Sequence, residues 1–155
     1  MDTVPYRIVD LPAMRVAALR AFGPSPEEEA WNRMLAWAKE RGLLDGQPAP
    51  RFFGFNNPNP TPGSPNYGYE VWITVGPQVQ PEQGVEILEI PAQRCATLLH
   101  DGHTDEIFPA WQRLVAAVEQ SPHAVGDDRC LEEHLRFFDP ESGTIRLDLL
   151  LPVSA

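Results

Sequence analysis

The first half of the chain alternates between apolar runs that suit strands and apolar residues spaced as on a helix. Residues 15–22 form a run of Val, Ala and Leu that is typical of a strand buried on at least one face. Apolar residues then recur at helical spacing from Trp31 to Ala38, between polar residues that make an exposed face. Two strand-like segments follow at 51–55 and 69–75. The pattern therefore predicts the order strand, helix, strand, strand.

Residues 25–28 carry the signals that begin a helix. Ser25 can cap the free amides of the first turn, Pro26 has no amide to leave unpaired, and Glu28 can reach back to the cap. Gly42 is a suitable end, because glycine readily takes the left-handed conformation that closes many helices. We therefore expect a helix that begins at about Pro26 and ends just before Gly42.

The second half repeats this order. Its expected elements are a strand over 94–100, a helix from about Thr104 or Phe108 to Glu119, and strands over 131–138 and 144–151. Pro109 fits the helix only if the helix proper begins near Phe108, because a proline in a helix interior removes a hydrogen bond. The last two strands are joined by residues 139–143, whose Asp, Pro, Ser and Gly favour a hairpin turn.

The common order reflects an internal repeat. Leu11–Leu19 and Ile90–Leu98 share Pro, Ala, Arg, Ala and Leu in register, at an offset of 79 residues. The Ala-Trp dipeptides of the two expected helices also match, after one inserted residue. We interpret the chain as a single domain over 1–155, duplicated as pseudo-repeats 5–76 and 85–155.

Two units of this kind predict an α+β fold. Each unit buries one face of its strands under its helix, so that the two together form a curved antiparallel sheet with two main helices. The concave surface between the halves then forms a cleft, which is a natural place for a small ligand.

Charge and composition indicate an ordinary globular protein that does not bind nucleic acid. The chain has 155 residues, of which 43% are hydrophobic, and a net charge of −10. Such a charge repels phosphate backbones and attracts cations, so we expect no nucleic-acid binding by this chain alone. The sequence has no apolar run of the roughly 18 residues that a membrane helix needs, and no signal peptide. We therefore expect a cytoplasmic protein that does not bind membranes.

A family resemblance is carried by five segments: Leu11–Ala17, Ile90–Ala96, Tyr69–Val75, Leu131–His134 and Leu149–Val153. Together they resemble the GyrI-like small-molecule-binding domains, which also occur as effector-binding domains of multidrug-responsive transcription regulators. The resemblance covers nearly the whole chain and implies a duplicated fold of about eight strands and two helices. It also implies an aromatic-lined pocket with a buried glutamate, used to bind amphipathic and often cationic compounds.

The resemblance places the buried acid on the strand after the second helix, where Glu132 and Glu133 are adjacent. Successive strand residues face opposite sides, so Glu133 shares its side with Leu131, Leu135 and Phe137. A carboxylate among apolar groups loses hydration unless a cation or hydrogen-bond donors compensate, which makes Glu133 the stronger candidate for a pocket acid. Glu132 is the alternative, and a third interpretation leaves both carboxylates solvated.

Glu70 is a further candidate acid. It shares a strand face with Trp72 and Thr74. If that face lines the cleft, Glu70 is a second pocket acid beside Trp72, and if the face points outward, Glu70 is merely solvated. Asp148 lies at the matching position of the second repeat.

Aromatic residues on the cleft-forming segments complete the set of expected ligand contacts. The set consists of Phe53, Phe55, Tyr67, Tyr69, Trp72, Phe108 and Trp111. Tyr67 and Tyr69 are favoured because their hydroxyls tolerate a wet rim. Trp111 matches Trp31 across the repeat, so packing in the core is its competing interpretation.

Metal and cofactor chemistry find no support in the sequence. His100 and His103 flank a glycine bend, and His134 follows two glutamates, but these spacings match no metal-binding motif. Serine-nucleophile and P-loop patterns are also absent from the sequence. We expect neither a metal nor a cofactor.

Three functions remain. The leading hypothesis is a stand-alone protein that senses or sequesters amphipathic small molecules, above all lipophilic cations. The alternative is an enzyme: some members of the resembling family hydrolyse strained electrophilic compounds, and Glu133 would then aid the attack of water. The third is a partner module for a topoisomerase or a separate regulator. The sequence leaves binding and turnover open.

Overall fold

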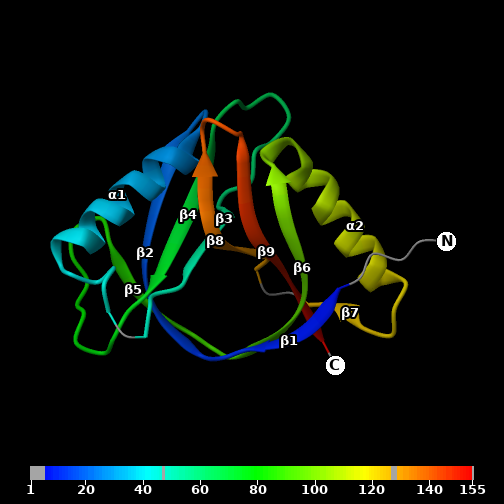
Figure 1. The fold of residues 1–155 in the computed structure, drawn as a ribbon, viewed down its shortest axis with the longest axis horizontal. Helices are drawn as coiled ribbons and strands as arrows, with labels where there is room; N and C mark the ends of the chain where they lie inside the picture. Colours follow the sequence, from blue (N-terminus) through cyan, green and yellow to red (C-terminus); the bar gives the residue numbers. More distant parts are fainter. Residues whose placement is uncertain (1–5, 47, 127–128, 155) are drawn as a thin grey trace. The chain divides into compact units, whose positions relative to one another are not determined.

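The structure is a computed structural model that describes residues 6–46, 48–126 and 129–154 (Figure 1). Its elements are β1 (Arg7–Leu11), β2 (Met14–Gly23), α1 (Pro26–Glu40), β3 (Phe52–Asn56), β4 (Tyr67–Thr74), β5 (Glu86–Ile90), β6 (Gln93–His103), the 3-10 helix η1 (Thr104–Glu106), α2 (Ile107–Glu119), β7 (Ala124–Val125), β8 (Leu131–Asp139) and β9 (Thr144–Ser154). They group into two compact units. The first unit is Ala13–Pro91, and the second consists of the described residues up to Pro12 and from Ala92 onward.

The first unit is an antiparallel sheet covered by one helix. Its strands follow the order β3-β4-β2-β5, and α1 packs on β4 and β2 (Figure 1). The side chains of Ala17, Met34, Val71 and Ile73, on the side of the sheet that α1 covers, are all fully buried. Strands and helix therefore contribute jointly to the apolar interior that the hydrophobic pattern predicts.

The second unit has the same design. Its strands follow the order β1-β6-β9-β8, β7 adds to β9, and α2 packs on β6 and β9. Its core joins residues of α2 to alternate residues of β9 and to one of β6: Ala96, Ala110, Leu114, Val118, Ile145, Leu147, Leu149, Leu151 and Val153. Antiparallel strands with two separate helices confirm the predicted α+β class.

The strand that begins each sequence repeat pairs with a strand from the other repeat. Leu11 of β1 pairs with Gln93 of β6, and Met14 of β2 pairs with Ile90 of β5. An offset of 79 residues converts either pair into the other. The hydrophobic pattern misses β1 and β5, which are short edge strands of their units and in which Leu11 is the one buried residue.

Ion pairs follow the same correspondence. Arg94 Nε lies 2.9 Å from Asp10 Oδ1 in the second unit, and Arg15 Nη1 lies 3.3 Å from Glu89 Oε1 in the first. Exposed ion pairs contribute little to stability. Their repetition at matching positions is instead what a duplicated sequence would produce.

The boundaries of α1 agree with the sequence, but its first turn does not. The helix begins at Pro26, and the Ser25 side chain makes no capping hydrogen bond, so the predicted serine cap is wrong. At the other end Gly42 has a φ of 67°, and the amides of Gly42 and Leu43 donate to the carbonyls of Lys39 and Ala38. This is the glycine-closed helix end that was expected.

The start of α2 explains how a proline fits in it. η1 precedes the helix, and α2 itself begins at Ile107, so that Pro109 is its third residue. Amides in the first turn have no partner inside a helix, so the missing amide of Pro109 breaks no hydrogen bond there.

β8 departs from a regular alternation of side chains. Its register with β9 shifts between His134 and Arg136 and again between Arg136 and Asp139. Each shift adds a residue to β8, which turns the following side chains to the other face. Leu135 is accordingly 45% exposed. The prediction that one regular face runs as far as Phe137 is therefore wrong beyond His134.

Candidate functional site

Two contacts show which face of the first unit's sheet points toward α1. The Trp31 ring of α1 lies edge-on to Phe52, with ring centroids 6.2 Å apart. The Tyr67 hydroxyl donates to the carboxylate of Glu27, which is also in α1. Side chains alternate along a strand, so the neighbours of Phe52 and Tyr67 in sequence lie on the other face. That face carries an aromatic–carboxylate surface, which consists of Phe53, Phe55, Glu70 and Trp72.

Two neutral groups hold the carboxylate of this surface. Trp72 Nε1 donates to Glu70 Oε2 over 2.7 Å, and Asn57 Nδ2 donates to Glu70 Oε1 over 3.0 Å. No ion pair reaches Glu70 from the residues that the structure describes. An indole and an amide stabilise a carboxylate without cancelling its charge. The arrangement therefore fixes a negative charge beside apolar rings, with Arg20 of β2 opposite Glu70 in the strand pairing.

The rings beside Glu70 are buried, with Phe53 0%, Trp72 3% and Phe55 6% exposed. Phe55 lies directly opposite Glu70 in the β3–β4 pairing and is edge-on to Trp72, with centroids 5.0 Å apart. The Arg51 guanidinium lies 5.2 Å from the centre of the Phe53 ring. One face of the Phe53 ring is therefore occupied by a cation of the protein itself, in a cation–π contact.

In the second unit, the residues of β9 that do not pack on α2 define the opposite face. Asp148 and Leu150 alternate with the core residues of β9, so they point away from α2. Glu133 of β8 pairs with Asp148, and Thr97 of β6 pairs with Leu150. This face carries an acidic surface, which consists of Thr97, Leu131, Glu133, Asp148 and Leu150.

The structure separates the two adjacent glutamates of β8. Glu132 faces α2, where Trp111 Nε1 donates to its Oε2 over 3.0 Å. Glu133 points to the other face and is only 7% exposed. Of the two, Glu133 is therefore the acid on the face away from the helix. The assignment of either to ligand binding stays a prediction.

Glu133 and Asp148 occupy directly opposed positions on neighbouring strands. Side chains in such positions lie close together, and like charges there repel each other. A positive charge brought to this face would be attracted by both carboxylates. The acidic surface therefore brings two carboxylates together, and each of them also interacts with another group of the folded protein.

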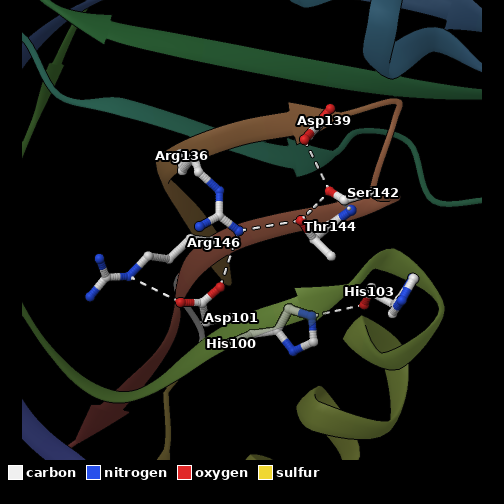
Figure 2. A network of polar contacts seen from close by, with 8 residues as sticks. All are labelled: His100, Asp101, His103, Arg136, Asp139, Ser142, Thr144 and Arg146. Carbon is white, nitrogen blue, oxygen red and sulfur yellow. Dashed lines mark hydrogen bonds and ion pairs between the residues drawn. The ribbon is translucent and has the colours of Figure 1, made fainter.

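A charged cluster lies one step further along the same three strands (Figure 2). In the strand pairing Asp101 lies opposite Arg146, and Arg146 lies opposite Arg136. Arg136 Nη2 is 3.1 Å from Asp101 Oδ1, and Arg146 Nε is 3.9 Å from Asp101 Oδ2. These side chains are about half exposed, so the cluster is a surface feature.

The histidines make internal contacts. His100 Nε2 lies 2.9 Å from the carbonyl oxygen of His103 (Figure 2). His134 stacks on Phe137, with ring centroids 5.5 Å apart, and burial lowers the pKa of His134 to about 4. Within the described part of the chain, His, Cys, Asp and Glu nowhere gather into a group of three that could hold a metal ion.

The remaining predicted aromatic residues lie elsewhere than on the two surfaces. Tyr67 and Tyr69 belong to the face that α1 covers, and Tyr69 packs so closely on Gly54 that a Cβ there would collide with its ring. Burial, and then the Glu27 carboxylate, raise the pKa of Tyr67. Phe108 is 70% exposed on α2, and Trp111 is half-buried on the same helix. Their role in ligand binding stays a prediction.

Sequence reasoning missed Asn57 and Glu27. Asn57 lies two residues after Phe55, so strand alternation puts both side chains on the same face. This spacing could have identified Asn57 as a neighbour of Phe55 and Glu70. Glu27 looked like a solvated residue of the first helical turn. Its contact with Tyr67 spans 40 residues, which no local pattern encodes.

Two open hollows lie beside the ends of paired strands, one in each unit. One has a volume of about 390 Å³ and is lined from Ala13–Arg15 and Glu89–Pro91, and the other has about 560 Å³ and is lined by Asp10, Leu11 and Ala92–Arg94. Neither is lined by a predicted site residue. The predicted cleft between the halves stays a prediction.

Comparisons with known proteins agree with this fold. A family model described as the GyrI-like small molecule binding domain matches residues 5–154. A comparison with curated protein sequences finds no match. None of the helices in the described residues is long and apolar enough to cross a membrane.

Solved structures share the fold at low sequence identity. The C-terminal domain of EcmrR is 16% identical with a TM-score of 0.74, over 97% of each chain. In an EcmrR–DNA complex, this chain spans 57% of the EcmrR chain. A hydrolase from Listeria innocua is 14% identical with a TM-score of 0.71, over 99% of this chain and 94% of its own. SAV2435 bound to tetraphenylphosphonium is 11% identical with a TM-score of 0.62, over 98% and 95%.

Proposed function

The chain belongs to the GyrI-like small molecule binding domain family, and from this premise we propose that it binds amphipathic organic cations. The observation that carries the proposal is the Glu70 carboxylate, held by the neutral groups of Trp72 and Asn57 beside the ring of Phe55. The protein would sense or sequester such compounds in the cytoplasm, without a cofactor.

The physical reason is the combination of charge and rings. A lipophilic cation loses little hydration when it enters an apolar site, because its charge is spread over a large surface. A carboxylate in a poorly hydrated place attracts it more strongly than a carboxylate in water does. Aromatic faces add a further attraction of about 0.5 to 2 kcal/mol for each well-placed ring. Glu133 and Asp148, which lie opposite each other on β8 and β9, are the second pair of candidate acids.

A structural neighbour supports the ligand class. SAV2435 was solved with tetraphenylphosphonium, a lipophilic cation with four aromatic rings. That finding concerns SAV2435, which shares the fold and 11% of the sequence. It makes tetraphenylphosphonium the natural first probe for this chain.

The proposal is tested by titrating the protein with tetraphenylphosphonium in a calorimeter. We expect micromolar affinity for the parent protein. Neutralising the acid that contacts the ligand, by Glu70→Gln or Glu133→Gln, should weaken binding about tenfold, or by about 1.4 kcal/mol. Glu28→Gln is the control, because Glu28 is an exposed acid of α1, which covers the opposite face of the sheet from Glu70. Absence of binding, or equal binding by all three variants and the parent, would contradict the proposal.

Hydrolysis is a second candidate, favoured by the likeness in fold to the Listeria innocua hydrolase. A buried carboxylate such as Glu133 could take a proton from water as the water oxygen bonds to a ring carbon and a carbon–carbon bond of the strained ring breaks. The carboxyl group then returns the proton to the released carbon, so that water is added across the broken bond. The measurement is turnover of an electrophilic cyclopropane compound by the parent protein and by Glu133→Gln and Glu70→Gln. Turnover that both variants retain at the parent rate would rule out this mechanism.

A further inference from the structure

The base of the loop between β3 and β4 is packed closely against β4. The Asn57 amide donates to the carbonyl oxygen of Gly68 over 2.7 Å, and the Gly68 amide donates to the carbonyl oxygen of Pro58 over 3.0 Å. A Cβ at Gly68 would collide with the Asn57 carbonyl group and would lie 2.8 Å from Pro58 Cδ. Only glycine at position 68 therefore allows the Asn57 backbone to lie where it does.

This close approach brings the Asn57 side chain to Glu70. Gly68 and Glu70 are two residues apart on β4, so the space left by the missing side chain is on the same face as the carboxylate. Asn57 occupies that space, and its Nδ2 lies 3.0 Å from Glu70 Oε1. Trp72 holds the other oxygen, Oε2. Both oxygens are thus fixed by groups on one face of the first unit.

We propose that Gly68 and Asn57 are positioning residues for cation binding, which act only through the orientation of the Glu70 carboxylate. The inference rests on the proposed function, because it concerns the same ligand class and the same acid. Without the Asn57 donor the carboxylate is held by Trp72 alone, so its Oε1 is less restrained and a ligand must restrict that motion on binding. With the donor present, the negative charge already points in one direction.

The experiment is a double-mutant cycle in the full chain, with tetraphenylphosphonium as the probe and calorimetry as the readout. Asn57→Ala is made in the parent and in the Glu70→Gln background. We expect a loss of affinity of about fivefold in the parent and a change of less than about twofold in the Glu70→Gln background, because residues that act through each other are not additive. Asn59→Ala, an exposed residue of the same loop, is the control and should leave affinity unchanged.

Gly68→Ala gives an independent test from the backbone side. We expect it to weaken binding at least as much as Asn57→Ala does, and again only when Glu70 is present. Gly23→Ala is the matched control: Gly23 is on the neighbouring strand β2, and a Cβ there meets no atom within 4 Å. Thermal unfolding of each variant identifies any that does not fold, and Asn57→Ala then decides the question alone.

The possible failures are distinguishable. If tetraphenylphosphonium binds and Glu70→Gln weakens it, but Asn57→Ala costs the same in both backgrounds or nothing in either, the positioning role is overturned and the proposed function stands. If Glu70→Gln has no effect while Glu133→Gln does, the positioning role is overturned and the binding function moves to the acidic surface. If the parent protein binds no tetraphenylphosphonium, both proposals fall.

Discussion

At the scale of single residues, neighbours in sequence take different environments. Glu132 and Glu133 are adjacent, yet one accepts a hydrogen bond from Trp111 under α2 and the other lies buried on the opposite face. Strand parity predicts this separation. It could not predict that Trp111 is the partner of Glu132, because α2 and β8 meet only in the folded chain. The position of Glu133, but not its surroundings, was therefore accessible from the sequence.

His134 makes the stability of the protein depend on pH. It is 8% exposed, and burial lowers its pKa to about 4, from an ordinary value near 6.5. The unfolded chain therefore takes up this proton at a higher pH than the folded chain, so the stabilisation is present above about pH 6.5 and is lost as the pH falls toward 4. The loss attributable to this one group between pH 7 and pH 4 is about 3 kcal/mol.

The measurement is the free energy of unfolding in urea at pH 7 and pH 4, for the parent and for His134→Gln. The variant should lose less stability on acidification than the parent does, because its amide does not titrate. His103→Gln serves as control, since His103 is exposed. If the parent and His134→Gln lose the same free energy of unfolding between pH 7 and pH 4, the buried imidazole of His134 does not cause the pH dependence.

At the scale of elements, side-chain contacts fasten the helix to its sheet. The Tyr67 hydroxyl at the start of β4 donates to Glu27 in the first turn of α1. The loop from β3 returns at the same point, where the Asn57 amide donates to the Gly68 carbonyl and the Gly68 amide donates to the Pro58 carbonyl. One end of α1, the end of the loop and the beginning of β4 are therefore joined by a few polar contacts, close in sequence to Glu70.

Removal of the Tyr67 hydroxyl tests this fastening. Tyr67→Phe leaves the Glu27 carboxylate without its partly buried donor, which should lower the free energy of unfolding by about 1 to 3 kcal/mol. Urea unfolding at pH 7 measures the change. Tyr6→Phe is the control, because the Tyr6 ring packs on the core of the second unit. A loss no larger than that of the control would mean that the contact contributes nothing.

At the scale of the whole molecule, the sequence predicts more of the fold than of the site. The six strands and two helices expected from periodicity and from the repeat are all present. So are the start of α1 at Pro26 and the left-handed glycine, Gly42, just beyond its end. The edge strands β1 and β5 were not predicted, because neither shows a regular alternation of buried and exposed residues. The contact of Asn57 with Glu70 was not predicted, because it depends on Gly68, 11 residues away in sequence. Only the pairing of β3 with β4 brings Gly68 beside Asn57.

The division into units predicts which fragments can fold. A fragment over 13–91 retains all the strands of the first sheet, whereas a fragment over 5–76 follows the sequence repeat and loses β5, the partner of β2. The 13–91 fragment should therefore show more β-structure by circular dichroism and greater resistance to protease than the 5–76 fragment. Equal behaviour of the two would indicate that β5 does not help to hold the first unit together.

The pairing of β1 with β6 and of β2 with β5 has a consequence for a chain that held only one repeat. Such a chain would have an opening strand with no neighbour and a second strand lacking its edge partner, both with free backbone hydrogen-bonding groups. Two identical copies would satisfy each other by domain swapping, each donating its opening strand to its twin. Fusion of two copies of the gene would place both repeats in one chain, where these strand pairings form within a single polypeptide.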